Sequence, residues 1–285
     1  MTKIDQYESA FRSADKAVYT YQRIEPAKIL VVSDFDGEAA NRFFESVRSF
    51  LSVLDDVRPT FSHLDGDAFE TVGELLEAVE LRQPDLIVTY RHLHSEAWHW
   101  PYSLGQHLDV LTQATPIPVL VLPHPDDDQS LPQSLLNTDR VMAITDHLAG
   151  DDVLVNWALR FTESDGTCWL THIESGPGLE RILDAVSKIA EIDSEQANTL
   201  IPAQLLKEPA DYIRGCRNLI ESEEIRVKIE EIVTVGHRLS EYRRLVEEHQ
   251  IDLLVMHTMD GDQFAMRGSA YPLAVELRQI PLLML

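Results

Sequence analysis

The feature that most constrains this chain is an internal repeat. Three short apolar motifs occur twice, in the same order. The matching pairs are KILVVSD at 28–34 with RVMAITD at 140–146, PDLIV at 84–88 with IDLLV at 251–255, and IPVLVL at 117–122 with IPLLML at 280–285. Ordered self-similarity of this kind predicts a chain that folds as two copies of one structural unit.

The two copies differ in length. The offset between them grows from 112 residues at Asp34 and Asp146 to 167 residues at Asp85 and Asp252. The second copy therefore carries 55 extra residues between its first and second motifs. Since a βαβ unit needs about 30 residues, we expect the first copy to lack a strand and a helix.

Strands and helices are predicted to alternate along both copies. The predicted strands are 29–33, 86–90, 118–122, 141–145, 167–173, 252–256 and 280–285, with a further β-prone stretch at 225–235. The predicted helices are 43–54, capped by Asp36, then 75–81, 102–113, 151–161, 238–249, 271–278, and a long stretch over 179–223 that proline should interrupt near Pro202 and Pro209. All-apolar strands that alternate with helices predict a parallel sheet covered by helices on both faces.

The repeat leads to a predicted division of the chain. We expect a helical extension at 1–27, an abbreviated domain at 28–123, an acidic, proline-bearing linker at 124–137 and a complete domain at 138–285. Each copy closes with a short apolar strand, and edge strands of this kind seek a partner. The two α/β domains are therefore expected to pack as a pseudo-dimer, closing strand against closing strand.

Composition excludes several classes of partner and location. The formal charge of −24 argues against nucleic acid or an anionic membrane surface as the partner. Apolar runs are too short for a membrane helix, and residues 1–10 are too polar for a signal peptide. Cys168 and Cys216 make neither a disulfide framework nor a metal-ligand pattern. A cytoplasmic location is the expectation.

Taken in order, the motifs resemble those of the universal stress protein family. The residues that carry this resemblance are VSDF at 32–35, ITD at 144–146, THI at 171–173, VG at 235–236, DLLVM at 252–256, GS at 268–269 and LRQIPLL at 277–283. The resemblance implies a five-stranded α/β fold of the adenine nucleotide alpha hydrolase type, with some members that bind ATP. It also implies that relatives often dimerise through the closing strand.

ATP-binding members of the family are similar to one another in a Gly-x2-Gly-x9-Gly-Ser/Thr pattern after the fourth strand. Glycine lets backbone N–H groups approach phosphate oxygens closely. In the second copy, Gly261 and Gly268 are seven positions apart instead of ten, although Ser269 follows. Asp260 and Asp262 place negative charge where phosphates would lie.

The first copy departs further from this pattern. It has no glycine between positions 90 and 104, and Gly105 is followed by neither serine nor threonine. A nucleotide site is therefore expected to be absent from the first copy and degenerate in the second.

The resemblance places Asp146 at the adenine, so the candidate cofactor-binding residues are Asp146, Gly261, Gly268 and Ser269. The alternative interpretation is structural: Asp34 and Asp146 cap helices after strands, and Gly268-Ser269 starts a helix. We expect no stable cofactor, with ATP as the alternative.

Two further segments carry possible chemistry. His92, His94 and His99 follow a predicted strand and either hold a zinc or copper ion or belong to a loop that packs over a lost nucleotide site. Residues 176–178, Gly-Pro-Gly, are expected to form a loop instead of a cofactor turn, because the third glycine of that fingerprint is missing. No set of residues assigns a nucleophile, a base and an oxyanion donor together, so neither catalytic residues nor a metal site are predicted.

The predicted function is that of a non-enzymatic cytoplasmic stress-response protein. It is expected to act through an unidentified protein partner, as a monomeric pseudo-dimer or a homodimer, without stable ATP binding. One alternative is an adenine-nucleotide sensor that uses the divergent loop of the second copy. A further alternative, which rests on fold analogy alone, is a hydrolase of adenylated substrates.

Overall fold

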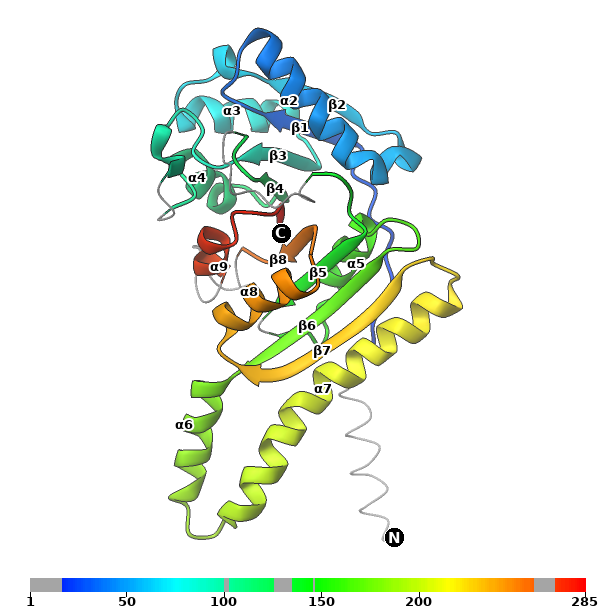
Figure 1. The fold of residues 1–285 in the computed structure, drawn as a ribbon, viewed down its shortest axis with the longest axis vertical. Helices are drawn as coiled ribbons and strands as arrows, with labels where there is room; N and C mark the ends of the chain where they lie inside the picture. Colours follow the sequence, from blue (N-terminus) through cyan, green and yellow to red (C-terminus); the bar gives the residue numbers. More distant parts are fainter. Residues whose placement is uncertain (1–16, 100–102, 126–134, 146, 259–269) are drawn as a thin grey trace.

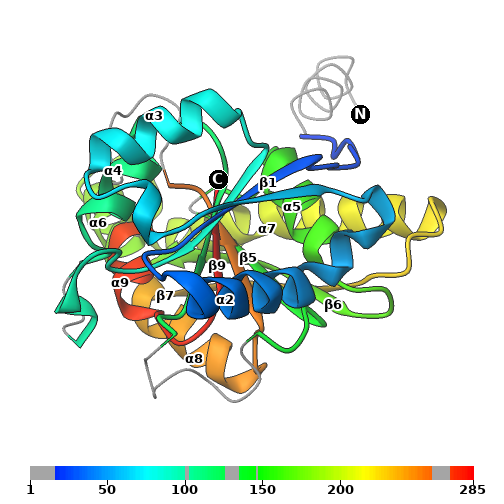
Figure 2. The ribbon, with the colours of Figure 1, turned by 90° about the horizontal axis from the view of Figure 1, so that it is seen from above.

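The computed structural model of the chain describes residues 17–99, 103–125, 135–145, 147–258 and 270–285. Within these ranges the strands form one nine-stranded sheet in the order β2-β1-β3-β4-β9-β8-β5-β6-β7. Helices lie on both faces of this twisted sheet (Figures 1 and 2). The predicted architecture, a mostly parallel sheet flanked by helices, is confirmed.

The sheet has two halves, each of which is parallel throughout. The N-terminal half contains β1 (Lys28–Val32), β2 (Thr60–Leu64), β3 (Leu86–Tyr90) and β4 (Val119–Leu122). The C-terminal half contains β5 (Arg140–Thr145), β6 (Thr167–Ser175), β7 (Lys228–Gly236), β8 (Leu253–Met256) and β9 (Leu282–Met284). The repeated motifs occupy equivalent places, because β3 lies between β1 and β4 just as β8 lies between β5 and β9.

Helices connect the strands within each half. They are α2 (Gly37–Phe50), α3 (Val72–Arg82), α4 (Gln106–Ala114), α5 (Asp152–Phe161), α6 (Gly176–Ser187), α7 (Ser194–Ser222), α8 (Arg238–Glu248) and α9 (Ala270–Glu276). In α2, for example, Phe43, Val47 and Phe50 recur at helical spacing and are buried. Among the described residues, no helix is long and apolar enough to cross a membrane. Cys168 and Cys216 are free and buried.

The two halves meet at an antiparallel pair, β4 with β9, in which Leu120 lies opposite Leu283. Both leucines are fully buried. The predicted pairing of the closing strands is thereby confirmed, whereas the residue boundaries of the domains stay a prediction. Buried Arg91 adds a contact across the halves, since its guanidinium donates to the carbonyl oxygens of Ala274 and Leu277 at the end of α9, the latter at 3.3 Å.

The strand β2 was not predicted from the sequence. Its residues TFSHL alternate between exposed and half-buried positions up to the buried Leu64, at the edge of the sheet, so no continuous apolar run marks the strand. With β2 included, the N-terminal half has four strands, and its missing strand is the counterpart of β7.

The predicted helical extension at 1–27 is wrong for the part that the structure describes. Residues 17–27 have no regular secondary structure and run across α5. Tyr19 is buried there, and its hydroxyl donates to Asn156 Oδ1 at 2.6 Å. The Asn156 side chain also accepts from Gln22 N–H and donates to Thr20 O, so one buried amide fixes the segment. Residues 1–16 lie outside the described residues.

Two helix predictions also need correction. The long helical stretch breaks at 188–193, where Asp193 caps α7, and α7 then continues through both Pro202 and Pro209. Each proline removes one backbone donor, and Pro209 is buried within the helix. Residues 176–178 form the first turn of α6 instead of a loop, because Ser175 Oγ accepts from Gly178 N–H at 3.2 Å and proline suits a first turn.

Candidate functional site

Parallel α/β sheets bind ligands at the carboxyl ends of their strands. This sheet has two such edges, which point in opposite directions because β4 and β9 are antiparallel. In the N-terminal half, the carboxyl ends of β1 and β3 form what we call the N-terminal edge. In the C-terminal half, the carboxyl ends of β5, β6 and β8 form what we call the C-terminal edge.

Asp34 holds the N-terminal edge together. Its carboxylate accepts the hydroxyl proton of Tyr90 and the backbone N–H of His94, the latter at 2.6 Å. Its own N–H donates to Tyr90 Oη at 3.1 Å. The predicted role of Asp34 as a helix cap is wrong, because Asp36 occupies the N-cap of α2, and even Asp36 makes no side-chain capping bond. The Asp34 carboxylate instead accepts hydrogen bonds from Tyr90 and His94.

Aromatic rings fill the space around this carboxylate. The Tyr90 ring lies 5.1 Å from Phe43, 5.5 Å from Phe35 and 5.2 Å from His124, measured between ring centroids. Tyr90 itself is fully buried. The N-terminal edge is thus packed by its own side chains.

The loop after β3 is folded tightly over the same edge. His92 and His94 both adopt left-handed backbone conformations, with φ of 62° and 54°. His92 N–H donates to Leu104 O at 3.0 Å. A Cβ on Gly105 would lie 2.7 Å from His92 Cα, so this close approach requires glycine. Gly105 therefore serves the packing of the loop.

The predicted histidine cluster is divided by this fold. His92 is buried, and burial together with nearby Arg91 lowers its pKa, whereas His94 is exposed and packs against Phe69 at 4.8 Å between ring centroids. The side chain of His99 lies outside the described residues. Among the side chains that are described, no group of three His, Cys, Asp or Glu residues is placed to hold a metal ion. These contacts favour the alternative of a loop packed over the edge.

The C-terminal edge carries charged and titratable groups instead of aromatic packing. His172, near the end of β6, has its Nε2 3.6 Å from Glu174 Oε2, and both side chains are largely buried. His172 Nδ1 is buried and has no hydrogen-bond partner among the described residues. Burial lowers the pKa of His172, Glu174 opposes this shift, and Arg238 reinforces it. A neutral imidazole with one unused nitrogen therefore lies at this edge.

A second histidine follows β8. His257 Nε2 lies 3.0 and 2.9 Å from the two carboxylate oxygens of Asp151. Asp151 also caps α5, since its Oδ1 accepts from Leu154 N–H at 3.1 Å. The carboxylate fixes the orientation of an imidazole that is part-exposed, an arrangement that suits proton transfer or the binding of a polar ligand.

The four predicted cofactor-binding residues, Asp146, Gly261, Gly268 and Ser269, lie outside the described residues. The chain on either side of them is described at the C-terminal edge. Thr145 ends β5, and Thr258, after β8, donates from both its N–H and its hydroxyl to Leu285 O.

The polar residues that the structure brings to this edge were not among the predicted site residues. They are Asp151, His172, Glu174, Arg238 and His257. A signal for one pair existed, because residues two apart on a strand share a face, as His172 and Glu174 do. Asp151 and His257 are 106 residues apart and had no local signal.

A different surface is formed by α6 and α7. These helices make an antiparallel hairpin that extends beyond the sheet (Figure 1). Four of the eight large exposed hydrophobic residues among those described belong to this hairpin, namely Ile182, Ile189, Ile192 and Leu200. Clustered exposed aliphatic side chains are typical of a protein interaction surface.

No protein-family model and no curated protein matches the chain. Solved structures do match its fold. A universal stress protein from Archaeoglobus fulgidus DSM 4304 has a TM-score of 0.54 at 12% identity, over 90% of this chain and 95% of its own. A proposed universal stress protein from Pseudomonas aeruginosa UCBPP-PA14 has a TM-score of 0.50 at 14% identity, over 91% and 93%.

A protein of unknown function from Pseudomonas aeruginosa PAO1 has a TM-score of 0.51 at 13% identity, over 91% of this chain and 92% of its own. Likeness at such low identity shows the fold. The chain therefore has a mostly parallel α/β sheet flanked by helices, as universal stress protein structures have.

Proposed function

We propose that the protein is a stress-response protein of the universal stress protein type that acts by binding another protein. In this proposal it is a cytoplasmic protein, a monomer or a homodimer, it is not an enzyme, and it holds no nucleotide stably. The observation that carries the proposal is the closed N-terminal edge, where Asp34 is bound by Tyr90 and His94.

Closure of this edge bears directly on nucleotide binding. By resemblance, the aspartate after the first strand of each copy contacts adenine in family members that bind ATP. In the N-terminal half that residue is Asp34, and an adenine base would have to displace the buried Tyr90 ring. Breaking a hydrogen bond to a charged, part-buried group costs about 1.5–3 kcal/mol before any contact with ligand is made.

The C-terminal half supports the same conclusion from its sequence. The glycine pattern is shortened between Gly261 and Gly268, and Asp260 and Asp262 flank the first of these glycines. Carboxylates repel phosphate oxygens at short range. Tight triphosphate binding is therefore not expected there.

The hairpin of α6 and α7 is the surface that we propose for the partner. Exposed acidic residues alternate in sequence with its exposed aliphatic residues, namely Glu191, Asp193 and Glu195, while Asp184 pairs with Lys188 at 2.6 Å. Complementarity favours a partner protein with an apolar patch bordered by lysine and arginine. The net charge of −24 also disfavours acidic partners.

The partner can be tested by capture from cells that produce this protein, followed by reconstitution with the purified partner. The double change Ile189→Asp with Ile192→Asp is expected to lower the affinity at least about 30-fold, since each removes an apolar contact worth about 1–2 kcal/mol. Leu81→Asp is the matched control, because Leu81 is 84% exposed on α3 in the other half. Equal binding by both variants would remove the hairpin from the proposal.

Nucleotide binding is tested separately by calorimetry on the purified chain. We expect no micromolar binding of ATP, ADP or AMP. A micromolar dissociation constant that is lost in Asp146→Ala would contradict the proposal and establish the nucleotide sensor instead.

The sensor is the second candidate, and one observation favours it. At the C-terminal edge the described residues leave polar groups open, above all the buried His172 Nδ1, which has no hydrogen-bond partner among them. Buried polar atoms are normally hydrogen-bonded, so an unpaired one points to a missing water or ligand. If this candidate is right, ATP should raise the melting temperature of the parent but not of His172→Leu. Turnover of bound ATP would favour the hydrolase.

A further inference from the structure

The hairpin of α6 and α7 carries a group of exposed aliphatic side chains, and Figure 1 shows that it extends beyond the sheet. Ile182, Ile189 and Leu200 are 43%, 44% and 62% exposed. The large exposed hydrophobic residues that the structure describes outside the hairpin lie on separate segments, namely Val18, Leu81, Leu136 and Val153. Single exposed residues of this kind are normal on a protein surface, whereas a group on one feature indicates an interaction site.

The spacing of these residues places them on one side of the hairpin. Beyond the sheet, each helix of the hairpin is covered by the other. Ile182 comes three positions after the buried Leu179 on α6, and Leu200 comes three positions after the buried Ala197 on α7. An advance of three residues turns a helix by about 300°, which is about 60° short of a full turn. Because α6 and α7 are antiparallel, this rotation leads to the same side of the pair on both helices.

Two exposed alanines complete the same side. Ala185 comes three positions after Ile182, and Ala203 comes three positions after Leu200. Ile189, just beyond the end of α6, extends this side to the turn of the hairpin. We call Ile182, Ala185, Ile189, Leu200 and Ala203 the hairpin face. Its alanines leave room for a second helix at the distance of about 8–10 Å between axes that packed helices adopt.

The opposite side of the hairpin is polar. Glu180 and Asn198 each follow a buried residue by one position, and both are exposed. A step of one residue is a rotation of about 100° in the other sense, so these side chains lie away from the hairpin face. The outer surface of the hairpin is therefore apolar on one side only.

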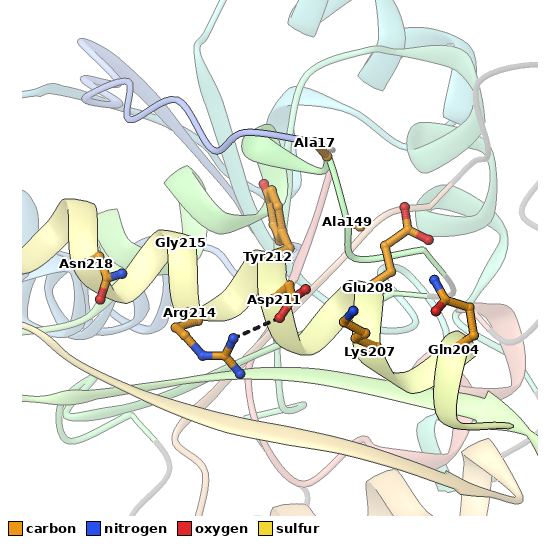
Figure 3. Close-up of a pocket in the computed structure, with 10 residues that line it drawn as sticks. All are labelled: Ala17, Ala149, Gln204, Lys207, Glu208, Asp211, Tyr212, Arg214, Gly215 and Asn218. Atoms are coloured by element: carbon orange, nitrogen blue, oxygen red, sulfur yellow. Dashed lines mark hydrogen bonds and ion pairs between the residues drawn. The ribbon is translucent and has the colours of Figure 1, made fainter. Parts of the chain in front are cut away.

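Figure 3 shows where the apolar side ends along α7. Gln204, Lys207 and Asp211 continue the row of Leu200 at steps of three or four residues, and they line a pocket of about 560 Å³. Arg214, next in this row, pairs with Asp211 at 2.8 Å. The apolar part of α7 thus covers residues 194–203, which is about 15 Å or nearly three turns.

The turn at one end of the hairpin face is acidic. Glu191, Asp193 and Glu195 lie in or next to this turn, and the sequence has no lysine, arginine or histidine between positions 189 and 206. The nearby Lys188 is paired with Asp184 at 2.6 Å. None of the three carboxylates has an ion-pair partner among the described residues. Charge complementarity therefore places lysine or arginine on the occupant at this end.

A helix suits the hairpin face better than an extended segment does. The backbone N–H and C=O groups of α6 and α7 are bonded within the helices, so this face offers side chains alone. An extended segment covered by it would leave its own backbone groups without partners, whereas a helix satisfies them internally.

We propose that the hairpin face binds one amphipathic α-helix of the partner protein, about three turns long, with lysine or arginine at the end over residues 188–193. Apolar residues of that helix at i, i+3, i+4 and i+7 pack between Ile182 and Leu200. The choice of a partner protein rests on the proposed function, whereas the helical form and the charge of the occupant rest on the hairpin face itself.

A phage-displayed library of random 14-residue peptides is the probe for this inference. Selection on the parent, with counter-selection on Leu200→Asp, should enrich peptides that have apolar residues at helical spacing and lysine or arginine at one end. Leu200 is exposed, so the unfolding midpoint of Leu200→Asp in urea should match that of the parent.

An enriched peptide is then made synthetically and measured by fluorescence anisotropy. It should bind Ile182→Asp and Leu200→Asp at least about tenfold more weakly than the parent. Asn198→Asp is the matched control, because it adds the same charge to the opposite side of α7, and it should bind like the parent. Circular dichroism should show more helix in the mixture than in the separate components.

Several outcomes would overturn the inference, whether or not capture from cells finds a partner. They are no enrichment over Leu200→Asp, enriched peptides without helical periodicity or without basic residues, and equal binding by Leu200→Asp and Asn198→Asp. A parent that sediments as a dimer, and a Leu200→Asp variant that sediments as a monomer, would assign the face to a second copy and overturn it as well. Helical, basic peptides that bind as expected, with no partner captured from cells, would contradict the proposed function alone.

Discussion

The N-terminal and C-terminal edges are built on the same strand order, but their side chains differ. Aromatic rings pack the N-terminal edge, whereas charged and titratable groups lie at the C-terminal edge. Tyr90 and His257 occupy equivalent places in the repeat, each 167 residues from the other, as Asp85 is from Asp252. Tyr90 donates to the aspartate after β1 and closes its edge, whereas His257 contacts Asp151 at the start of α5. The strand order is kept, while the residue at the end of the strand makes a different contact in each half.

This difference extends to the loops that follow. After β3 the chain turns back through left-handed residues and packs His94 on Phe69. At the C-terminal edge, His172, Glu174 and Arg238 lie at the strand ends without such a lid among the described residues. The two edges therefore differ in how their described side chains are packed, although the strand order of the two halves is the same.

The largest effect is expected from disrupting the β4–β9 pair, which joins the two halves. Leu283 is fully buried opposite Leu120, so Leu283→Asp both removes packing and buries an unpaired charge. We expect a loss of more than about 4 kcal/mol in the free energy of unfolding, with an increased hydrodynamic radius before secondary structure is lost. Urea unfolding and size-exclusion chromatography measure both.

The exposed residue Leu81 supplies the control for Leu283→Asp. Leu81→Asp should change the free energy of unfolding by less than about 0.5 kcal/mol. A Leu283→Asp variant with the unfolding midpoint and radius of the parent would show that the β4–β9 pair does not hold the halves together.

The next effect contrasts two aspartates at equivalent places, Asp85 and Asp252. Both accept backbone N–H groups, but Asp252 is buried, and burial raises its pKa to about 6. Because the folded protein binds this proton more tightly than the unfolded chain, the contribution of Asp252 to stability is greatest below pH 4. It falls as the pH rises through about 6.

Asp252→Asn should remove this dependence. At pH 7.5 the variant should be more stable than the parent by up to about 3 kcal/mol, and at pH 4 the two should be similar. Asp85→Asn, at an exposed position, should show no such gain. Urea unfolding across pH 4–8 measures this, and an identical pH profile for the parent and Asp252→Asn would refute the assignment.

A smaller effect on stability is expected from changing the equivalent residues Tyr90 and His257, one at each edge. Tyr90→Phe keeps the ring but leaves the Asp34 carboxylate without its hydroxyl donor. We expect a loss of about 2 kcal/mol, as for hydrogen bonds to charged groups. His257→Gln, at the equivalent place, should cost less than about 1 kcal/mol because this side chain is part-exposed. Equal losses by thermal and urea unfolding would mean that the N-terminal edge is no more closed than the C-terminal one.

The strand frame was predictable because its signals are local. The motifs at 28–34, 84–88 and 117–122 are continuous apolar runs, and their repeats predicted these strands and the β4–β9 pair. The strand β2 was missed because it is half-exposed and carries no such run.

The candidate site was much less predictable. Asp34 and Tyr90 are 56 residues apart, and Asp151 and His257 are 106 apart, so only the folded sheet brings them together. The residues chosen by resemblance, Asp146 among them, lie outside the described residues and stay predictions. Local patterns specify elements, while the partners of a carboxylate depend on tertiary packing.

The smallest effect concerns the helices that follow β1 and β5. Asp36 is the N-cap of α2 and makes no side-chain capping bond, whereas Asp151 caps α5 and orients His257. Asp151→Ala should therefore cost about 1 kcal/mol, and Asp36→Ala less than about 0.5 kcal/mol. Asp151→Ala combined with His257→Gln should cost less than the sum of the single changes, because each single change already breaks their shared contact. Additive losses in urea unfolding would show that Asp151 acts as a cap alone and does not orient His257.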